Sequence, residues 1–283
     1  MFSTTINRNV AGIGVALCLL AGGCADPQPQ ASRSLEAIDA PDVMLIADVE
    51  WQQLNPARGD QSPKAGTLWG DRVGPGAGGF LLRPVDGFRS PPHIHNIAYR
   101  GVVIQGLLHN DDPDAADMWM PAASFWTQPA GEIHVTAAKG PDVLAYIEVE
   151  DDFGVLPATE AFPDPGRPVN IDASNLVWVE QGGIDIAYLW GTPKHGHSNG
   201  VLVRLPIGFT GGLQSGNDAM YAVVITGLLG TTSSTADGRV QLEPGSSLHA
   251  AGGAVAGLSN DGSDACILYV RSSGHVSPLI ARR

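Results

Sequence analysis

Short apolar runs bounded by glycine or proline follow one another along most of the chain. Examples are residues 79–84 (GFLLRP), 101–108 (GVVIQGLL) and 200–205 (GVLVRL). Runs of this length that are rich in β-branched residues and end at turn formers are typical of β-strands. No long segment has helical periodicity, and the chain contains 36 glycines and 21 prolines. The pattern therefore predicts an all-β protein rich in turns.

The same blocks occur twice in the same order. LWG stands at 68–70 and 189–191, and the strand-like runs at 79–84 and 101–108 return at 200–205 and 222–229. A third element, PAGEIH at 129–134, is paired with PGSSLH at 244–249. Repeated blocks indicate duplication of one domain, here a small antiparallel barrel. We expect one barrel over 39–155, a proline-rich linker over 156–170 and a second, degenerate barrel over 171–283.

The amino-terminal segment is interpreted as a targeting signal. Arg8 is followed by an apolar core at 10–20 that is too short to span a bilayer. The ending LAGGC at 20–24 resembles the lipobox of bacterial lipoproteins, which implies removal of residues 1–23 and lipidation of Cys24. A polar tether over 24–38 would follow, and Ala25 in place of Asp favours the periplasmic face of the outer membrane. The alternative is an ordinary secretory signal that is cleaved nearby.

Charge and cysteine content exclude several classes of protein. The 16 Lys and Arg against 29 Asp and Glu give a net charge of −13, which argues against binding to nucleic acid. We expect contact with a membrane through the lipid anchor only. After loss of Cys18 with the signal and use of Cys24 as the anchor, Cys266 has no partner for a disulfide, and its apolar strand predicts a buried core position.

Three histidines in the first copy have the spacing of a metal site. His93 and His95 are two residues apart, so on a strand their imidazoles point to the same face. His134 follows a Pro-x-Gly turn that can bring it from a neighbouring strand. Neutral imidazoles in this arrangement can share one divalent ion. The alternative is three unrelated, hydrogen-bonding histidines, whereas His195 and His197 are interpreted as parts of a surface turn.

These residues resemble the two motifs of the cupin superfamily. The first motif is matched by Gly87, His93, His95 and Gly106, and the second by Pro129, Gly131 and His134, with Ala123 at its leading glycine. The resemblance implies a fold of two tandem double-stranded β-helix (jelly-roll) barrels with a metal between the sheets. Tyr99 stands where most metal-binding cupins carry Glu, so the predicted site lacks the usual carboxylate ligand.

Three further residues are candidates for the site. Gln105 is six residues from Tyr99, and strand parity predicts that it faces the same way and supplies a neutral oxygen ligand. Glu132 is two residues from His134 and can approach the metal. Tyr99 and Glu132 are therefore the first candidates for proton transfer.

The second copy lacks these ligands. Alignment of Gly106 with Gly227 places Gln214, Gly216 and Met220 at the positions of His93, His95 and Tyr99. The third element places His249 opposite His134, and one imidazole does not form a metal site. We expect the second barrel to be structural or to form a dimer contact.

The segment from His93 to Gly140 is similar to an uncharacterised family of cupin-like proteins, some of them acetylacetone-dioxygenase-like. The similarity implies metal binding and the fold, and it does not supply a reaction. Our enzyme hypothesis is a metal-dependent dioxygenase or related oxygenase that holds Fe(II) and acts on a small carbonyl or enolate compound. Alternatives are a non-catalytic metal- or ligand-binding module of the cell envelope and a hydrolase or isomerase, with Zn or Mn as the ion. The resemblance to cupins, which often pair exposed sheet edges, implies a homodimer.

Overall fold

Strands are the main secondary structure of the described chain. The computed structural model describes residue 1, residues 40–233 and residues 238–280. Cys24, the tether and all but the first residue of the predicted signal peptide lie outside these residues. Within the part of the chain that is described, no helix is long and apolar enough to cross a membrane.

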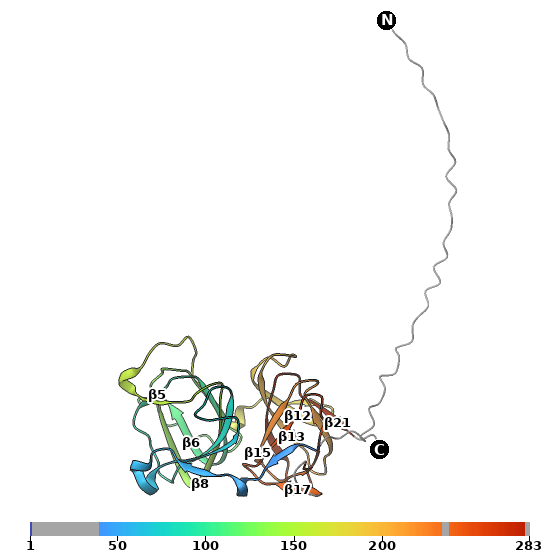
Figure 1. The fold of residues 1–283 in the computed structure, drawn as a ribbon, viewed down its shortest axis with the longest axis horizontal. Helices are drawn as coiled ribbons and strands as arrows, with labels where there is room; N and C mark the ends of the chain where they lie inside the picture. Colours follow the sequence, from blue (N-terminus) through green and yellow to red (C-terminus); the bar gives the residue numbers. More distant parts are fainter. Residues whose placement is uncertain (2–39, 234–237, 281–283) are drawn as a thin grey trace, which may run out of the picture. The chain divides into compact units, whose positions relative to one another are not determined.

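The first half of the described chain contains nine strands and three short 3₁₀ helices (Figure 1). They are β1 (Asp42–Met44), η2 (Ile46–Asp48), β2 (Trp51–Gln53), η3 (Pro56–Gln61), β3 (Lys64–Trp69), β4 (Gly78–Arg83), β5 (His93–His95), β6 (Tyr99–Asp111), β7 (Phe125–Gln128), β8 (Val135–Val149), β9 (Val155–Pro157) and η4 (Ala158–Glu160).

The described part of the second half contains twelve strands and one 3₁₀ helix. They are β10 (Val169–Ile171), η5 (Ala173–Asn175), β11 (Val179–Gln181), β12 (Ile184–Gly191), β13 (Asn199–Leu205), β14 (Thr210–Gln214), β15 (Met220–Thr226), β16 (Leu229–Thr232), β17 (Arg239–Leu242), β18 (Ser247–Ala250), β19 (Ala256–Ser259), β20 (Cys266–Ser272) and β21 (Ser277–Ile280).

Two seven-stranded antiparallel sheets form the centre of the fold. Their strand orders are β10-β7-β6-β8-β4-β3-β2 and β1-β18-β15-β20-β13-β12-β11. A five-stranded sheet, β17-β16-β19-β14-β21, lies in the second half, and β5 pairs with β9 in the first. The long strands β6 and β8 continue beyond their sheet partners and pair with each other to Asp111 and Val135. The predicted all-β fold of two tandem jelly-roll barrels is confirmed.

The first strand of each half pairs with the barrel of the other half. β1 pairs with β18, whereas the next strand, β2, pairs with β3. In the same way β10 pairs with β7, whereas β11 pairs with β12. Each central sheet is therefore completed by a strand from the other copy of the repeat. The proline-rich segment between the copies is not a free connection, because its ends belong to β9 and β10.

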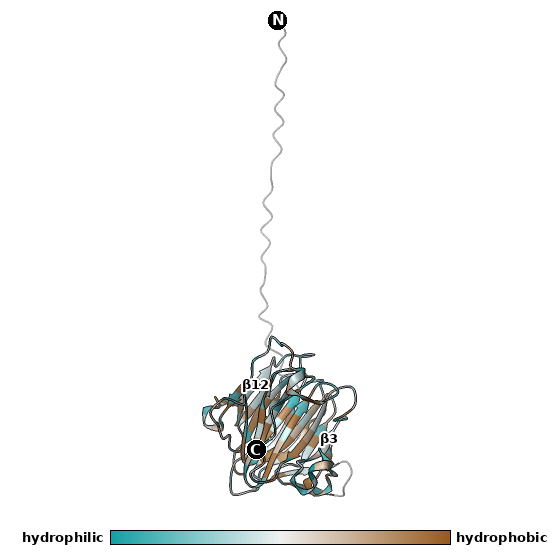
Figure 2. Ribbon diagram, turned by 90° about the vertical axis from the view of Figure 1, so that its left-hand side faces the viewer, coloured by the Kyte–Doolittle hydropathy of each residue, from teal (hydrophilic) through white to brown (hydrophobic). Residues whose placement is uncertain are grey.

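Buried apolar residues form three clusters. Figure 2 shows hydrophobic residues, in brown, along the strands. One cluster fills the barrel of the second half, and another fills the barrel of the first half. The remaining cluster joins the two central sheets, because it combines Leu81, Val102 and Phe125 with Leu202, Val223 and other residues of the second half. The buried thiol of Cys266, on β20, belongs to the core of the second barrel as predicted.

The repeated LWG and glycine blocks have a common structural reason. The indole Nε1 of Trp69 donates to the Tyr146 hydroxyl at 3.0 Å, and that of Trp190 donates to the Tyr269 hydroxyl at 2.9 Å. A side chain at Gly79 would collide with the first of these pairs. Gly200, the equivalent residue of the second copy, faces the second pair in the same way. Each copy therefore keeps glycine where its strand passes this tryptophan–tyrosine pair.

A buried carboxylate joins the two barrels. Glu148 is fully buried on β8 and accepts hydrogen bonds from Arg271 Nη1 at 2.6 Å and from the Tyr269 hydroxyl at 3.0 Å, both on β20. Arg271 also binds Glu150 through two nitrogens, at 3.0 and 2.8 Å. Burial raises the pKa of Glu148, and Arg271 and Arg100 act against that shift. This polar cluster fixes the pairing of the two copies within an otherwise apolar contact.

Candidate metal centre

Two backbone segments bring the three predicted histidines together. His93 and His95 lie on β5, and a β-bridge joins His93 to His134, just before β8. The two residues of this bridge exchange both backbone hydrogen bonds, at 3.1 and 3.0 Å. One ring nitrogen from each of the three imidazoles lies within 4.8 Å of the other two. The structure therefore assembles the cluster that the motif spacing predicts.

The hydrogen bonds of the imidazoles fit metal ligation. Nδ1 of His93 lies 3.0 Å from the carbonyl of Pro91, Nδ1 of His95 lies 2.9 Å from that of Gly154, and Nδ1 of His134 lies 3.1 Å from that of Glu132. A carbonyl oxygen only accepts, so each Nδ1 carries the proton and each Nε2 keeps a free lone pair. Carbonyl acceptors of this kind orient metal-binding histidines in proteins. The donor set and its supports therefore fit a divalent ion.

The surroundings keep the imidazoles uncharged. His95 and His134 are buried, and His93 is half-buried. Burial, followed by repulsion from His93, lowers the pKa of His134 to about 3. Burial also moves the pKa of His95 well below its ordinary value, with His134 and His93 adding to the shift. Neutral imidazole is the form that binds a metal, so the site does not need to lose protons at neutral pH.

Tyr99 lies in a buried polar network beside His134. Its hydroxyl donates to Asn110 Oδ1 at 2.8 Å and lies 3.5 Å from His134 Nε2. Asn110 is held by Thr136, whose hydroxyl donates to the same oxygen at 2.7 Å, and it donates in turn to Gln128 Oε1 at 2.9 Å. Burial raises the pKa of Tyr99 to about 12. The hydroxyl therefore stays protonated, with its proton directed at Asn110.

The structure does not bring Gln105 to the histidines. Its side chain is exposed and lines a different pocket, together with Arg83 and Asp142. The pairing of β6 with β8 is irregular on both sides of Gln105, between Val103 and Gln105 and again before Leu107. The irregularity between Val103 and Gln105 lies between Tyr99 and Gln105, so it invalidates the parity argument that connected these two residues.

Glu132 contacts the site through its backbone. Its carbonyl accepts from His134 Nδ1, whereas its carboxylate does not line the pocket over the histidines. The pKa of Glu132 is raised, first by partial burial and then by repulsion from the acidic residues Asp111, Asp112 and Asp164. The carboxylate therefore belongs to a group of acids beside the site and is not directed at the imidazole nitrogens.

The second barrel has apolar residues where the first has its cluster. Leu213 pairs with Ala256 as His93 pairs with His134. Met220 pairs with the last residue of β18, as Tyr99 pairs with the last residue of β7. Leu213, Met220 and Ala256 all belong to the buried core of this barrel. Strand register places Leu213, and not Gln214, at the position of His93. Apolar packing replaces the site here.

His249 is not the counterpart of His134. It lies opposite Tyr221 on β15, as Thr127 lies opposite Arg100 on β6. The third repeated element is therefore offset by 122 residues (249 minus 127), whereas the sequence alignment used 115 (249 minus 134). Two similar proline turns in the first copy caused the error. The turn before β7 is the true match, because Ala123 and Gly245 both have positive φ, 67° and 92°.

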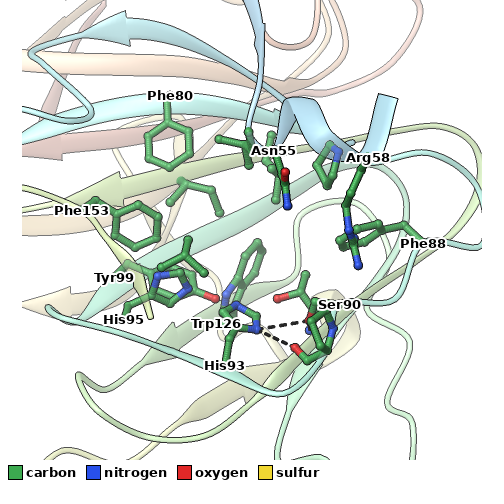
Figure 3. Close-up of a pocket in the computed structure, with 17 residues that line it drawn as sticks. Asn55, Arg58, Phe80, Phe88, Ser90, His93, His95, Tyr99, Trp126 and Phe153 are labelled. Atoms are coloured by element: carbon green, nitrogen blue, oxygen red, sulfur yellow. Dashed lines mark hydrogen bonds between the residues drawn. The ribbon is translucent and has the colours of Figure 1, made fainter. Parts of the chain in front are cut away.

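A pocket of about 420 Å³ opens over His93 and His95. Figure 3 shows His93, His95, Tyr99 and Trp126 on one side of it, and Asn55, Arg58 and Phe88 on another. Its other walls are mainly apolar, from Leu54, Phe80, Leu82, Ile147, Phe153 and Val155. The ring of Phe153 stacks on His95 with centroids 4.3 Å apart. A concave, mostly apolar cavity with a few convergent polar groups is typical of a small-molecule site.

Several supporting residues have no signal in the sequence. Ser90 lies 3.3 Å from His93 Nδ1 and accepts the backbone N–H of Thr136. Phe153 and the carbonyl of Gly154 reach His95 from 58 residues or more along the chain. Asn110 lies at the far end of β6 from Tyr99. Only the closure of the barrel brings these groups to the histidines.

The other histidine pair lies on the surface. His195 and His197 are exposed in the turn between β12 and β13, where His195 Nδ1 lies 2.8 Å from Asp218. Among the described residues, only His93, His95 and His134 form a cluster of potential metal ligands.

Residues 42–279 match the family model described as "Domain of unknown function (DUF4437)". Among solved structures, a protein from Nostoc punctiforme provisionally named a dioxygenase is similar, with a TM-score of 0.60, 15% identity and coverage of 86% of this chain and 87% of that chain. A variant of the Bacillus subtilis oxalate decarboxylase has a TM-score of 0.56 at 12% identity, covering 86% and 80%. The Lactobacillus farciminis oxalate decarboxylase, in complex with formate, has a TM-score of 0.56 at 11% identity, covering 84% and 88%. No curated protein matches the sequence. At these identities the similarities establish the fold alone.

Proposed function

The chain belongs to the DUF4437 family, and from that premise we propose that its first barrel is a metal-dependent enzyme of the dioxygenase type, acting on a small carbonyl or enolate compound. One observation carries the proposal. Three neutral imidazoles, each fixed through Nδ1 by a backbone carbonyl, converge beside an apolar pocket. The provisional dioxygenase name of the Nostoc punctiforme structure supports this choice of reaction class.

His93, His95 and His134 would hold the ion, with Fe(II), Mn and Zn as the candidates. When bound, a divalent ion supplies Lewis-acid polarisation of a carbonyl or enolate oxygen. Other residues of the chain shape the environment of the ion. The aromatic and aliphatic walls of the pocket exclude water, which strengthens electrostatic interactions inside it. Because the imidazoles are neutral, the site favours a substrate that brings negative charge.

Tyr99 is the group best placed to hold a proton. Its hydroxyl lies 3.5 Å from His134 Nε2 and 2.8 Å from Asn110 Oδ1. Because its pKa is raised to about 12, it stays a neutral donor while a substrate is bound. Turning this donor from Asn110 towards a substrate oxygen would stabilise developing negative charge there.

A specific observation also favours the non-catalytic alternative. Burial raises the pKa of Tyr99 and lowers the pKa values of the three histidines, so all four move away from neutral pH. A general base works best with a pKa near the working pH. A metal- or ligand-binding module needs no such base, and a hydrolase or isomerase would require a bound water or the substrate to supply it.

Oxygen uptake separates these alternatives. The purified protein is loaded anaerobically with Fe(II) and mixed with acetylacetone or another 1,3-diketone in an oxygen-electrode cell. The proposal predicts substrate-dependent oxygen consumption that is absent from the Zn-loaded protein and from a His134→Ala variant. If oxygen stays constant across a panel of diketones and phenolic acids while Fe(II) remains bound, the protein is not a dioxygenase of this type.

We also propose that the protein is a lipoprotein anchored through Cys24 at the periplasmic face of the outer membrane. The sequence LAGGC at 20–24 supports the proposal. Labelling of cells with a tagged fatty acid should mark the wild type and leave a Cys24→Ser variant unmarked. Equal labelling of both would refute the anchor. The proposed homodimer is tested by sedimentation equilibrium, in which a single species of one chain mass would refute it.

A further inference from the structure

We propose that the pocket lined by His93 and His95 binds an organic carboxylate whose apolar body lies among the aromatic walls and whose charge is held by Arg58. This inference rests on the proposed function, because it names the class of compound that the same site accepts. Arg58 then acts as a specificity-determining residue at the pocket and not as a metal ligand.

The charge of the pocket differs from that of the whole chain. The protein has 29 Asp and Glu against 16 Lys and Arg, yet no Asp or Glu is found among the described residues that line this pocket. Arg58 is its one charged lining residue apart from the titratable histidines and tyrosine. A net-negative surface repels anions, so a cavity free of acids is the part of the molecule where an anion meets least repulsion.

Arg58 is available to a ligand. Its guanidinium lies 5.5 Å from the centre of the Phe88 ring, and no carboxylate within the described chain forms an ion pair with it. By contrast, each of five other arginines forms such a pair: Arg89, Arg100, Arg204, Arg239 and Arg271. Cation–π contact leaves the in-plane N–H groups of a guanidinium free, and their spacing matches the two oxygens of a carboxylate.

A second donor lies next to Arg58. Asn55 lines the pocket and caps η3, where its Oδ1 accepts the N–H of Ala57 at 3.1 Å. Its oxygen is thereby used, and its amide nitrogen remains as the group that it can offer to a ligand. The Arg58 guanidinium and the Asn55 amide nitrogen are both hydrogen-bond donors. A ligand group that accepts hydrogen bonds, such as a carboxylate, therefore fits this side of the pocket.

The layout of the pocket defines the shape of the ligand. Figure 3 shows Arg58 and Phe88 across the pocket from His95 and Tyr99, with Phe80 and Phe153 along the wall. A compound held at Arg58 would therefore pass its apolar body over these rings and present its other end to the histidines. The buried indole of Trp126, which lies edge-on to the ring of Tyr99, lines the same pocket.

Calorimetric titration with a matched pair of probes tests the inference. The probes are 3-phenylpropanoate and its neutral isostere 3-phenylpropanamide, and the protein is used both Zn-loaded and chelator-treated. In the chelator-treated protein we expect the anion to bind about tenfold more tightly than the amide, as for a charge-assisted hydrogen bond. Arg58→Gln should remove that preference, leaving amide affinity within about twofold, whereas Arg58→Lys should keep part of it.

Lys194→Gln is the matched control, because it removes one positive charge from an exposed turn of the second barrel. It should leave both affinities unchanged. Equal weakening of both probes by Arg58→Gln, an undiminished preference in that variant, or no binding of either probe would overturn the inference. If the wild type fails to bind Zn but still prefers the anion, the proposed function alone is refuted. If the wild type binds Zn but does not prefer the anion over the amide, this inference alone is refuted.

Discussion

Replacing Arg271 by Met should destabilise the protein by about 3 kcal/mol, at the lower end of the range for breaking a buried ion pair. The substitution keeps a long apolar side chain but removes the guanidinium that Glu148 faces at 2.6 Å. Glu148 is fully buried and would keep the Tyr269 hydroxyl at 3.0 Å, the Tyr146 hydroxyl at 3.3 Å and Arg100 at 3.5 Å. These remaining partners explain why the loss is not larger.

The loss of stability in Arg271→Met should depend on pH, whereas the loss from a simple packing defect would not. Burial already raises the pKa of Glu148, and loss of Arg271 raises it further, because Arg271 acts to lower it. A carboxyl whose pKa is higher in the folded state than in the unfolded state loses stability as pH rises through the folded value. The variant should therefore be closer to the wild type at pH 5 than at pH 8.

Urea unfolding followed by tryptophan fluorescence measures the effect. A loss of about 3 kcal/mol corresponds to a midpoint lower by about 1 M for a domain of this size. Arg204→Met is the matched control, because Arg204 also lies over a tryptophan ring and pairs with a carboxylate, Asp185, but at a partly exposed position. It should cost about 1 kcal/mol or less. Equal costs for the two variants, or a deficit that does not change with pH, would refute the buried pair as the link between the barrels.

Three further predictions concern the site and its supports. Tyr99→Phe removes only the hydroxyl proton donor, so it should leave metal content unchanged and reduce turnover, measured as oxygen uptake, by about 100-fold or more. Unchanged turnover would exclude Tyr99 from proton transfer. Glu132→Gln and Gln105→Ala should each retain the metal in elemental analysis, because neither side chain faces the imidazoles, and a loss of metal in either variant would contradict this geometry. Ala123→Val should lower stability by about 2 kcal/mol in urea unfolding, because a β-branched residue is strained at positive φ; Ala123→Gly is its control, expected within about 1 kcal/mol of the wild type.

The fold could be predicted from sequence because its signals are local. Apolar runs ending at glycine and the repeated LWG blocks mark strands and turns that the structure contains in both copies. The signal for His93 and His95 is also local, because a two-residue spacing on a strand places both rings on the same face. The Pro-x-Gly turn then supplied His134 through a motif that is also local.

The errors arose where local patterns do not determine register. An irregularity in the pairing of β6 with β8, between Val103 and Gln105, turned Gln105 away from the face that its spacing to Tyr99 predicts. Two similar proline turns shifted the alignment of His249. The pairing of β1 with β18 and the contact of Arg271 with Glu148 join residues more than 100 positions apart. Such contacts depend on how the two sheets pack, which no short pattern records.

Metal content tests the central claim most directly. The wild type, His93→Ala and His197→Ala proteins are purified without chelator, offered equal amounts of Fe(II), Mn(II) or Zn(II), and examined by elemental analysis after desalting, with circular dichroism to confirm folding. The account predicts about one ion per chain in the wild type and in His197→Ala, and loss of the ion from folded His93→Ala. Metal retained in His93→Ala, or lost from His197→Ala, would contradict it.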